Sequence, residues 1–413
     1  MGNKWTECEL GVFIELKRGY DLPKSARNEG SIPIISSSGF TDYNDKPMVK
    51  GPGVVTGRYG TIGEVFYSEE DFWPLNTTLY VVDFKGNDPL FVYYLLQTIS
   101  YADYTDKAAV PGINRNHLHK AKVKVPISLE IQQKVAAQLY QLEKRVTLGK
   151  QINQTLEQMS QTLFKSWFVD FDPVIDNALD AGNSIPEALQ SRAELRQKVR
   201  SSADFKPLPA DIRALFPAEF EEMEVGWVPK GWIVEPLTKV TNIVYGKNLP
   251  KTKIVNEGYP VYGGNGIIGF YSHYLYKNPQ VLISCRGAAS GKVHWTKPFC
   301  FVTNNSLVIE EKNISSLYIY YSLLQQDLTN LTSGSAQPQI TIANLNPVNV
   351  LLPKKEIISS FVRYAQDLQI SCEARKSECE TLSNLRDTLL PKLISGELSL
   401  EDFPDLIKQT EAA

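Results

Sequence analysis

Two stretches of the chain carry apolar residues at seven-residue intervals among polar positions. Residues 129–168 and 356–394 are dense in Gln, Glu, Lys and Leu, and the only proline in them is Pro391. Apolar rows at a and d spacing form the seam of a coiled coil, so we expect two long helices that pack together in antiparallel orientation. The predicted pairing residues are Val135, Leu139, Leu142, Val146, Leu156, Leu163, Phe361, Leu368, Cys372, Leu382 and Leu389.

An alternative is that each helix packs only on the globular segment that precedes it. Asn153 and Arg375 interrupt the apolar rows. A polar residue in a seam fixes the register of the pair at some cost in stability. Four heptads with polar flanks favour pairing between the helices.

The chain also repeats itself at an offset of 227 residues. Matches that keep this offset include Trp5 with Trp232, Gly19 with Gly246, Pro33 with Pro260, Gly39 with Gly266 and Val54 with Val281. After a one-residue slip, the sequence pairs Arg58 with Arg286, Gly63 with Gly291, Asn76 with Asn304 and residues 95–97 with residues 323–325. Turn residues that match between the two halves at one offset indicate a duplicated fold, since Gly and Pro mark positions of special backbone geometry.

The repeat predicts two copies of a mixed α/β (α+β) globule, each followed by a long helix. Short runs rich in Val, Ile and Tyr between turn signals predict strands in both globules. The predicted segments are a globule at 1–128, a helix at 129–171, an acidic Pro-containing connector at 172–231, a globule at 232–355, a helix at 356–396 and a tail at 397–413.

Composition narrows the class of protein. The 413 residues are 43% hydrophobic with a net charge of −3, and no run approaches the roughly 20 apolar residues that span a bilayer. The N-terminus lacks the apolar run of a signal peptide, so we expect a cytoplasmic protein. The five cysteines form no Cys-x-x-Cys pair, and only four histidines are present, which leaves little material for metal binding or imidazole catalysis.

Motifs of several enzyme classes fail on their context. Residues 264–269 match the dinucleotide fingerprint, but no Asp or Glu occurs from 258 to 309 to bind the ribose. Residues 287–293 resemble a phosphate loop that is one residue short and lacks the magnesium-binding Ser or Thr. Glu310-Glu311-Lys312 lacks a partner Asp for a nuclease metal site. We expect no catalytic residues, no metal and no cofactor in this chain.

The charges are distributed unevenly. Residues 236–355 carry eleven basic and four acidic residues, a charge of +7, whereas residues 12–128 carry thirteen of each sign. The connector has eleven acidic and seven basic residues. One neutral and one basic globule suit a protein that reads base edges better than a nonspecific phosphate binder.

Arginine, amide and lysine side chains in polar loops supply such readout, because Arg or Lys pairs with guanine and Asn or Gln with adenine in the major groove. For each of these side chains, a role in a turn or helix cap remains an equal alternative. The candidates for DNA contact are Arg58, Tyr59, Lys107, Asn114, Arg115, Asn116, Asn265, Arg286, Lys292, Asn305, Gln337, Gln339 and Thr341.

The duplicated globule and helix, together with residues 260–266, Arg286-Gly287 before Gly291-Lys292-Val293, and residues 163–173, resemble the specificity subunit of type I restriction-modification systems. The resemblance covers essentially the whole chain. It implies two target recognition domains that each read one part of a split double-stranded DNA sequence, with the paired helices as a ruler.

The resemblance also implies partners and cofactors. Two modification (methyltransferase) subunits would dock on the helices and connector, and restriction subunits would join them. S-adenosylmethionine, ATP and magnesium would bind to those partners, and the chain would be non-catalytic by itself. The long connector at 172–231 departs from the expected pattern and leaves its partner contacts open. A two-headed protein-interaction scaffold that binds no DNA, or an enzyme with an unrecognised site, are the alternatives.

Overall fold

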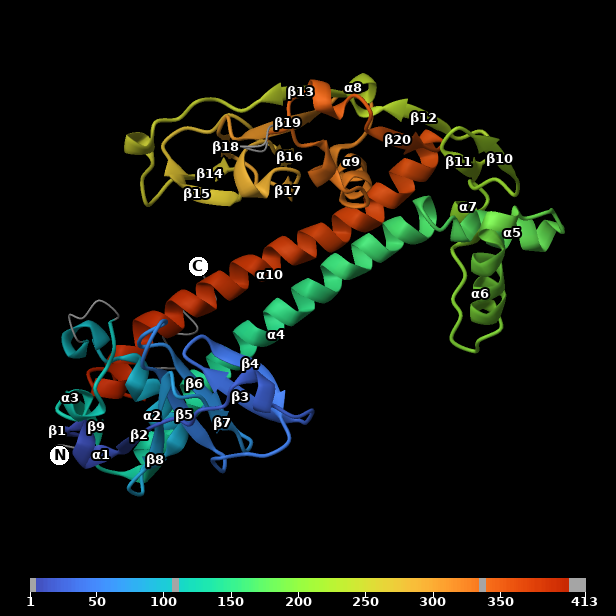
Figure 1. Cartoon of the computed structure of the whole chain (residues 1–413). Helices are drawn as coiled ribbons and strands as arrows, with labels where there is room; N and C mark the ends of the chain where they lie inside the picture. Colours follow the sequence, from blue (N-terminus) through green and yellow to red (C-terminus); the bar gives the residue numbers. More distant parts are fainter. Residues whose placement is uncertain (1–4, 106–110, 334–338, 401–413) are drawn as a thin grey trace. The chain divides into compact units, whose positions relative to one another are not determined.

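The computed structural model describes residues 5–105, 111–333 and 339–400. Its contacts divide the chain into two compact units (Figure 1). Unit 1 consists of Met1–Ile152 and Arg375–Ala413, and unit 2 consists of Asn153–Ala374. The two long helices, α4 (Leu129–Phe168) and α10 (Lys355–Ser395), each contribute one part to each unit.

Unit 1 contains three small sheets beside its share of the long helices. A four-stranded antiparallel sheet has the order β2-β8-β5-β6, a three-stranded sheet has the order β4-β3-β7, and β1 pairs with β9. The strands are β1 (Trp5–Glu9), β2 (Glu15–Arg18), β3 (Ile32–Ser36), β4 (Gly39–Asn44), β5 (Gly53–Gly57), β6 (Val65–Ser68), β7 (Trp73–Pro74), β8 (Thr78–Asp83) and β9 (Lys122–Pro126). The helices are α1 (Leu10–Phe13), α2 (Pro89–Gln97) and α3 (Arg115–Leu118), with short 3₁₀ turns at η1 (Lys24–Ala26) and η2 (Tyr101–Tyr104).

The alternation of side chains along β5 and β8 sets the layers of unit 1. Val54 and Leu79 pack in the core that contains α2, whereas their neighbours Val55 and Tyr80 pack with Ile35 of the three-stranded sheet. Successive strand residues point to opposite faces of a sheet. The four-stranded sheet is therefore covered on both faces, which explains why β5 is buried along its whole length.

Unit 2 repeats this arrangement strand for strand. Its four-stranded sheet has the order β13-β19-β16-β17, its three-stranded sheet has the order β15-β14-β18, and β12 pairs with β20. The strands are β12 (Ile233–Pro236), β13 (Thr241–Tyr245), β14 (Tyr259–Gly263), β15 (Gly266–Tyr271), β16 (Val281–Ser284), β17 (Val293–Trp295), β18 (Phe301–Val302), β19 (Ser306–Glu311) and β20 (Asn349–Leu352). The helices are α8 (Leu237–Val240) and α9 (Ser316–Leu324), with 3₁₀ turns at η4 (Lys251–Lys253), η5 (Gly287–Ala289), η6 (Leu328–Leu331) and η7 (Ala343–Leu345).

The cores of both units are completed by the ends of the long helices. In unit 1, Leu139 of α4 and Leu389 and Leu393 of α10 belong to one buried cluster with the residues of α2. The indole Nε1 of Trp5 donates a hydrogen bond to the carbonyl of Ile394 over 2.9 Å. In unit 2, Phe164, Trp167 and Phe168 of α4 pack with Tyr318 of α9 and Phe361 of α10, with ring centroids 5.1–6.3 Å apart.

The long helices also pack on each other in both units, as the heptad pattern predicts. In unit 1, the thiol of Cys379 lies 3.7 Å from the carbonyl oxygen of Val146. A Cβ built on Gly149 would come within 3.0 Å of the same sulfur, so glycine allows a close approach there. In unit 2, the thiol of Cys372 lies 4.0 Å from the carbonyl oxygen of Asn153. The two alternatives for these helices are thus combined, because each helix packs on its partner and on the globules.

Most predicted pairing residues are buried, and their place in the packing varies. Val135, Leu139, Leu142, Val146, Phe361, Cys372, Leu382 and Leu389 are buried, whereas Leu156, Leu163 and Leu368 are half-buried. The side-chain oxygen of Asn153 is buried without a hydrogen-bond partner among the described residues. The pair is therefore least apolar near its middle.

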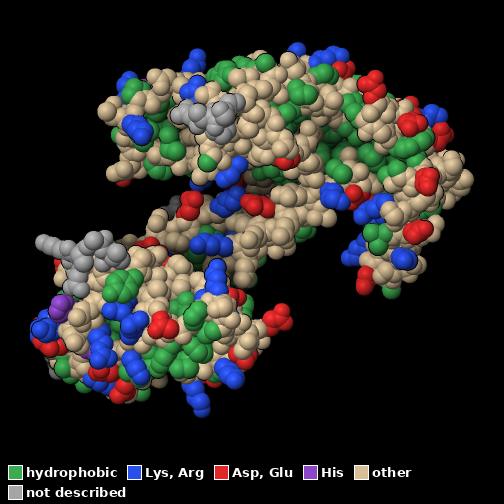
Figure 2. Space-filling model, viewed as in Figure 1, with side chains coloured by type: hydrophobic (Ala, Val, Ile, Leu, Met, Phe, Trp, Pro, Cys, Tyr) green, Lys and Arg blue, Asp and Glu red, His purple; other side chains and the backbone are tan. Residues whose placement is uncertain are grey.

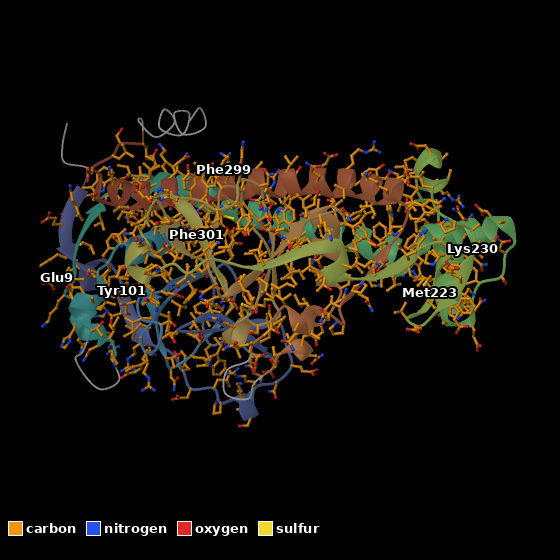
Figure 3. The ribbon with its side chains drawn as sticks, turned by 90° about the horizontal axis from the view of Figure 1, so that it is seen from above. Glu9, Tyr101, Met223, Lys230, Phe299 and Phe301 are labelled. Atoms are coloured by element: carbon orange, nitrogen blue, oxygen red, sulfur yellow. The ribbon has the colours of Figure 1, made fainter. Side chains whose placement is uncertain are left out.

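Residues 172–231 are more regular than a simple connector. They form α5 (Asp172–Ala181), η3 (Glu187–Leu189), α6 (Gln190–Arg200), α7 (Ala210–Arg213) and the hairpin of β10 (Phe220–Met223) and β11 (Gly226–Pro229). Figure 3 labels Met223 and Lys230 at this hairpin.

Ion pairs join α5 to α6 through residues spaced by four on each helix. Arg192 donates to both oxygens of Asp172 over 2.7 Å, and Arg196 donates to both oxygens of Asp176 over 3.0 and 2.5 Å. Arg200 pairs with Asp180 one turn further on. The spacing of i and i+4 places three carboxylates on one face of α5 and three guanidinium groups on one face of α6.

Candidate functional site

Loops from four parts of unit 2 meet at one end of its four-stranded sheet. The backbone nitrogen of Cys285 donates to the carbonyl of Asn305 over 3.0 Å, and that of Ser284 donates to the carbonyl of Lys292 over 2.9 Å. The backbone of Arg286 forms an isolated β-bridge with that of Gln339. These bonds bring together side chains that the sequence predicts as DNA contacts. We call Asn265, Arg286, Lys292, Asn305 and Gln339 loop cluster 2.

The side chains of loop cluster 2 are polar and accessible. Asn265, Arg286 and Lys292 are exposed, and the Lys292 ammonium donates to the Asn265 Oδ1 over 3.1 Å. The side-chain oxygen of Ser284 donates to the carbonyl of Gly264, which fixes the β14–β15 turn that carries Asn265. The cluster therefore presents two cationic groups and three amides on a hydrogen-bonded backbone.

Unit 1 has the same backbone bonds at equivalent positions. Arg58 donates from its backbone nitrogen to Thr77 over 2.9 Å, Gly57 donates to Glu64 over 3.0 Å, and Tyr59 forms a bridge with Gly112. The equivalents of loop cluster 2 form loop cluster 1, which consists of Ser38, Tyr59, Glu64, Thr77 and Gly112.

These bonds correct the repeat alignment. Arg286 is equivalent to Tyr59 rather than to Arg58. Tyr59 forms an isolated β-bridge with Gly112, and Arg286 forms the corresponding β-bridge with Gln339, with both residues 227 positions further along the chain. Gly60 and Gly287 keep this offset and both have positive φ, +75° and +77°. The extra residue of the second copy lies between Gly287 and Gly291, in the turn itself.

A second correction concerns the helices α2 and α9. The sequence pairs residues 95–97 with 323–325 at an offset of 228. The buried residues Phe91, Val92 and Tyr94 of α2 instead match Tyr318, Ile319 and Tyr321 of α9, at an offset of 227. The slip therefore ends before these helices rather than after them.

Several predicted contact residues have structural partners. The Arg58 Nε donates to the carbonyl of Ile113 over 3.2 Å, and its guanidinium lies 4.6 Å from the ring centroid of Tyr59. The Asn114 side chain caps α3 by accepting from the Asn116 nitrogen over 2.9 Å. Thr341 similarly donates to the Asn344 side chain over 2.6 Å.

The other candidates have different positions. Arg115 and Asn116 are exposed on the short helix α3. Lys107 and Gln337 lie outside the residues that the structure describes. Sequence reasoning missed Ser38, Glu64 and Thr77 of loop cluster 1. The matches of Gly39 with Gly266, Gly63 with Gly291 and Asn76 with Asn304 already place these residues opposite Asn265, Lys292 and Asn305.

The turn that carries Glu64 of loop cluster 1 packs against a buried tyrosine. Gly63 has φ of +83°, and a Cβ there would come within 3.0 Å of the Tyr101 ring. The Tyr101 hydroxyl accepts from Thr56 of β5 over 3.2 Å, and burial raises the Tyr101 pKa well above its usual value. Figure 3 labels Tyr101, which is buried in unit 1. The turn before Glu64 is thus held against a buried neutral side chain.

Charge and metal-binding capacity set limits on the chemistry. Figure 2 shows basic and acidic side chains interspersed over the visible face of the unit 1 globule. The described residues contain no group of three or more His, Cys, Asp or Glu side chains that could hold a metal ion. No helix among them has both the length and the apolar character needed to cross a membrane.

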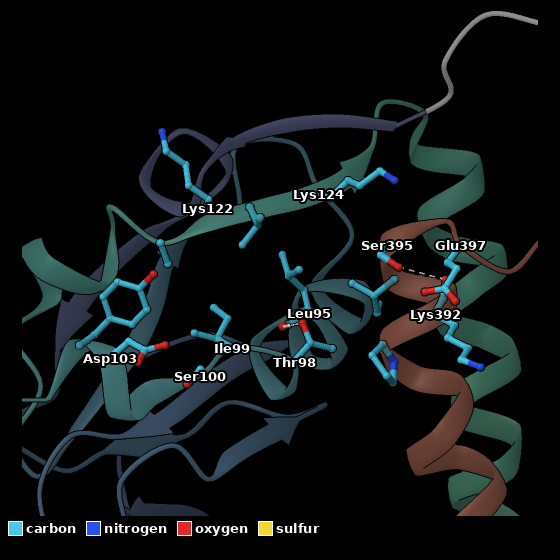
Figure 4. Close-up of a pocket in the computed structure, with 15 residues that line it drawn as sticks. Leu95, Thr98, Ile99, Ser100, Asp103, Lys122, Lys124, Lys392, Ser395 and Glu397 are labelled. Carbon is cyan, nitrogen blue, oxygen red and sulfur yellow. Dashed lines mark hydrogen bonds between the residues drawn. The ribbon is translucent and has the colours of Figure 1, made fainter.

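Unit 1 also has a groove of about 530 Å³ between β9, the end of α2 and the end of α10. Figure 4 shows Lys122 and Lys124 on its strand side and Lys392 on its helix side. The hydroxyls of Thr98 and Ser395 donate to helix carbonyls over 2.7 and 3.3 Å. The groove therefore offers cationic side chains together with the acidic Asp103 and Glu397, while these two hydroxyls are engaged by the backbone.

Comparisons with known proteins identify the same duplication. The family model described as "Type I restriction modification DNA specificity domain" matches residues 2–158 and 229–378, two segments whose starts lie 227 residues apart. The chain is 27% identical to the type I restriction enzyme HindI specificity subunit of Haemophilus influenzae, over 96% of this chain and 92% of that protein. It is 23% identical to the MjaIX specificity subunit of Methanocaldococcus jannaschii, over 76% of this chain and 70% of that protein.

A solved structure shares the fold. The crystal structure of the type I restriction-modification S subunit from M. genitalium aligns with a TM-score of 0.62 and 19% identity, covering 94% of this chain and 96% of that one.

Proposed function

Because the chain belongs to the family of type I restriction-modification DNA specificity proteins, we propose that its two units each read one half of an asymmetric, split DNA target through loop clusters 1 and 2. The observation that carries this proposal is the pair of loop clusters. They share their backbone hydrogen bonds and differ in every side chain. One scaffold with two sets of polar side chains suits the recognition of two different half-sites.

Base recognition would rest mainly on loop clusters 1 and 2. Arg286 and Lys292 donate to guanine edges, and Asn265, Asn305 and Gln339 pair with adenine, as major-groove geometry favours. Arg115 and Asn116, which are exposed on α3, suit contacts to the phosphate backbone. Arg58, Asn114 and Thr341 act by holding the loops, since each has a partner within its own unit.

The long helices would set the distance between the half-sites. A helix of 40 residues is about 60 Å long, more than a small globule needs to cover its own core. The helices and the connector would also dock two methyltransferase subunits, to which restriction subunits add. We assign S-adenosylmethionine, ATP and magnesium to those partners, and no catalytic step to this chain. The assembly would act in the cytoplasm.

The weak overall charge fits this division of labour. A net charge of −3 gives little nonspecific attraction to DNA, because affinity for the phosphate backbone grows with the number of phosphates neutralised. Firm binding would therefore require the partner subunits.

Methylome sequencing of host DNA, with and without this gene, tests the proposal. We expect a bipartite methylated sequence that disappears with the gene. Inserting one heptad into both α4 and α10 adds about 10.5 Å to the rod, which corresponds to about 3 base pairs of spacer at 3.4 Å each. An unchanged spacer would exclude the ruler, and the absence of any gene-dependent motif would favour a scaffold that binds no DNA.

A further inference from the structure

We propose that Glu64 and Lys292 occupy one equivalent base-reading position in the two units and select bases of opposite hydrogen-bonding character. Glu64 would select a base with an amino donor, foremost cytosine, and Lys292 a base with acceptors, foremost guanine. This inference rests on the proposed function and adds the residues that distinguish the two half-sites.

The backbone around the two residues is the same. The carbonyl of Glu64 accepts from Gly57 over 3.0 Å, and the carbonyl of Lys292 accepts from Ser284 over 2.9 Å. Each residue follows a glycine of positive φ, Gly63 at +83° and Gly291 at +92°. Each also immediately precedes a strand, β6 or β17, at the edge of the four-stranded sheet. Both side chains are exposed.

The identity of the side chains is the second part of the argument. A carboxylate cannot bind a phosphate, and on a loop facing DNA it is repelled by the backbone charge. Its favourable contact with a duplex is acceptance from a base amino group, chiefly the cytosine N4. A lysine ammonium donates to the O6 and N7 of guanine. The exchange of Glu for Lys therefore inverts the preferred base.

The residues that neighbour Glu64 and Lys292 in the two loop clusters also differ. In unit 2, the Asn265 Oδ1 accepts from the Lys292 ammonium over 3.1 Å, which holds the cation beside the β14–β15 turn. In unit 1, the equivalent residue is Ser38, whose hydroxyl lies 3.0 Å from that of Ser36. Serine is too short to take the place of Asn265, so loop cluster 1 presents Glu64 without that brace.

The test is a charge exchange in the full chain, expressed with its methyltransferase partners and followed by methylome sequencing. For Glu64→Lys we expect one base of the half-site read by unit 1 to change, with methylation of the original sites reduced about 10- to 100-fold. The half-site read by unit 2 should stay the same. For Lys292→Glu we expect the reverse pattern. Glu64→Gln, which keeps an acceptor and adds a donor, should relax the same base position.

Glu70→Lys is the matched control. Glu70 is an exposed residue beyond the other end of β6, so its substitution changes the charge of unit 1 equally. We expect this control to leave the methylated sequence unchanged. A similar effect of Glu64→Lys and Glu70→Lys, or a uniform change in methylation at all sites with an unaltered motif, would reduce Glu64 to a general charge effect and overturn the inference.

The inference and the proposed function fail in different ways. An unaltered motif in folded Glu64→Lys and Lys292→Glu proteins, or changes in both half-sites at once, contradicts the inference alone if the wild-type chain still directs bipartite methylation. If the wild-type chain directs none, the proposed function itself is wrong. Because both side chains are exposed, we expect these substitutions to leave the fold intact. Thermal melting of each variant checks this.

Discussion

Substitution of Gly149 by alanine probes the closest approach of the long helices in unit 1. The added Cβ would stand less than 3.0 Å from the Cys379 sulfur, nearer than real Cβ contacts come. Overpacking a core typically costs about 1–3 kcal/mol. Alanine in place of glycine gains about 1 kcal/mol of helix propensity. We therefore expect Gly149→Ala to destabilise the protein by roughly 0–2 kcal/mol, the difference of these terms.

A second substitution isolates the steric part of this balance. Cys379→Ala removes the sulfur, so Gly149→Ala in that background should show only the gain in helix propensity. The double variant should then be more stable than the sum of the single variants by about 1–3 kcal/mol. Urea unfolding of the full chain, followed by circular dichroism, measures these free energies.

The control for this cycle is Leu148→Ala combined with Cys379→Ala. Leu148 neighbours Gly149 and is 57% exposed, so it should not couple to Cys379. Its effects should add within about 0.5 kcal/mol. If Gly149→Ala and Cys379→Ala also add within that range, the helices do not approach each other at this point, and the reasoning is refuted.

Three further predictions concern single contacts. Asp176→Ala should cost about 2 kcal/mol of unfolding free energy, because the Arg196 guanidinium, whose side chain is only 15% exposed, loses two charge-assisted hydrogen bonds and keeps only its contact with Asp172 at 3.8 Å; a loss no larger than that of the exposed Asp204→Ala would contradict this. Hydrogen bonds from Arg200 and Arg213 hold the Asp180 pKa below its ordinary value of 3.8, so this contribution is present above that pH and is lost as the pH falls through the lower, folded-state pKa. Melting temperatures between pH 2 and 7 should fall less steeply at the acid end for Asp180→Asn, and equal slopes would refute the pairing. Trp5→Phe should cost about 1 kcal/mol and speed hydrogen exchange at the end of α10, because the Ile394 carbonyl loses its indole donor; unchanged exchange there would rule out the contact.

The features readable from the sequence were those with a strong local signal. The helices α4 and α10 follow from heptads, and the duplication follows from Gly and Pro residues at a fixed offset. The position of the slip was not readable, because the matching letters of Arg58 and Arg286 concealed that Tyr59 makes the equivalent bridge. That bridge joins residues about 50 positions apart, and only the folded backbone reveals it.

Two prolines of the connector stand at the starts of helices. Pro173 lies in the first turn of α5, and Pro209 directly precedes α7. Proline is favoured at these positions because it needs no amide donor there. The proline content of residues 172–231 is therefore compatible with regular helices. The members of loop cluster 1 were missed because Ser38, Glu64 and Thr77 are unremarkable in type and acquire meaning only through their equivalence to Asn265, Lys292 and Asn305.

The core of unit 1 has a consequence for synthesis. Leu389 and Leu393 complete a cluster that begins at Leu10, whereas unit 2 is formed by the continuous segment Asn153–Ala374. A ribosome adding about 5–20 residues per second needs roughly 12–50 seconds to proceed from Ile152 to Ile394. During that interval the second unit can close while the first still lacks the last strip of its interior. The part made first is thus completed last, and its core lacks these leucines until the end of α10 has been synthesised.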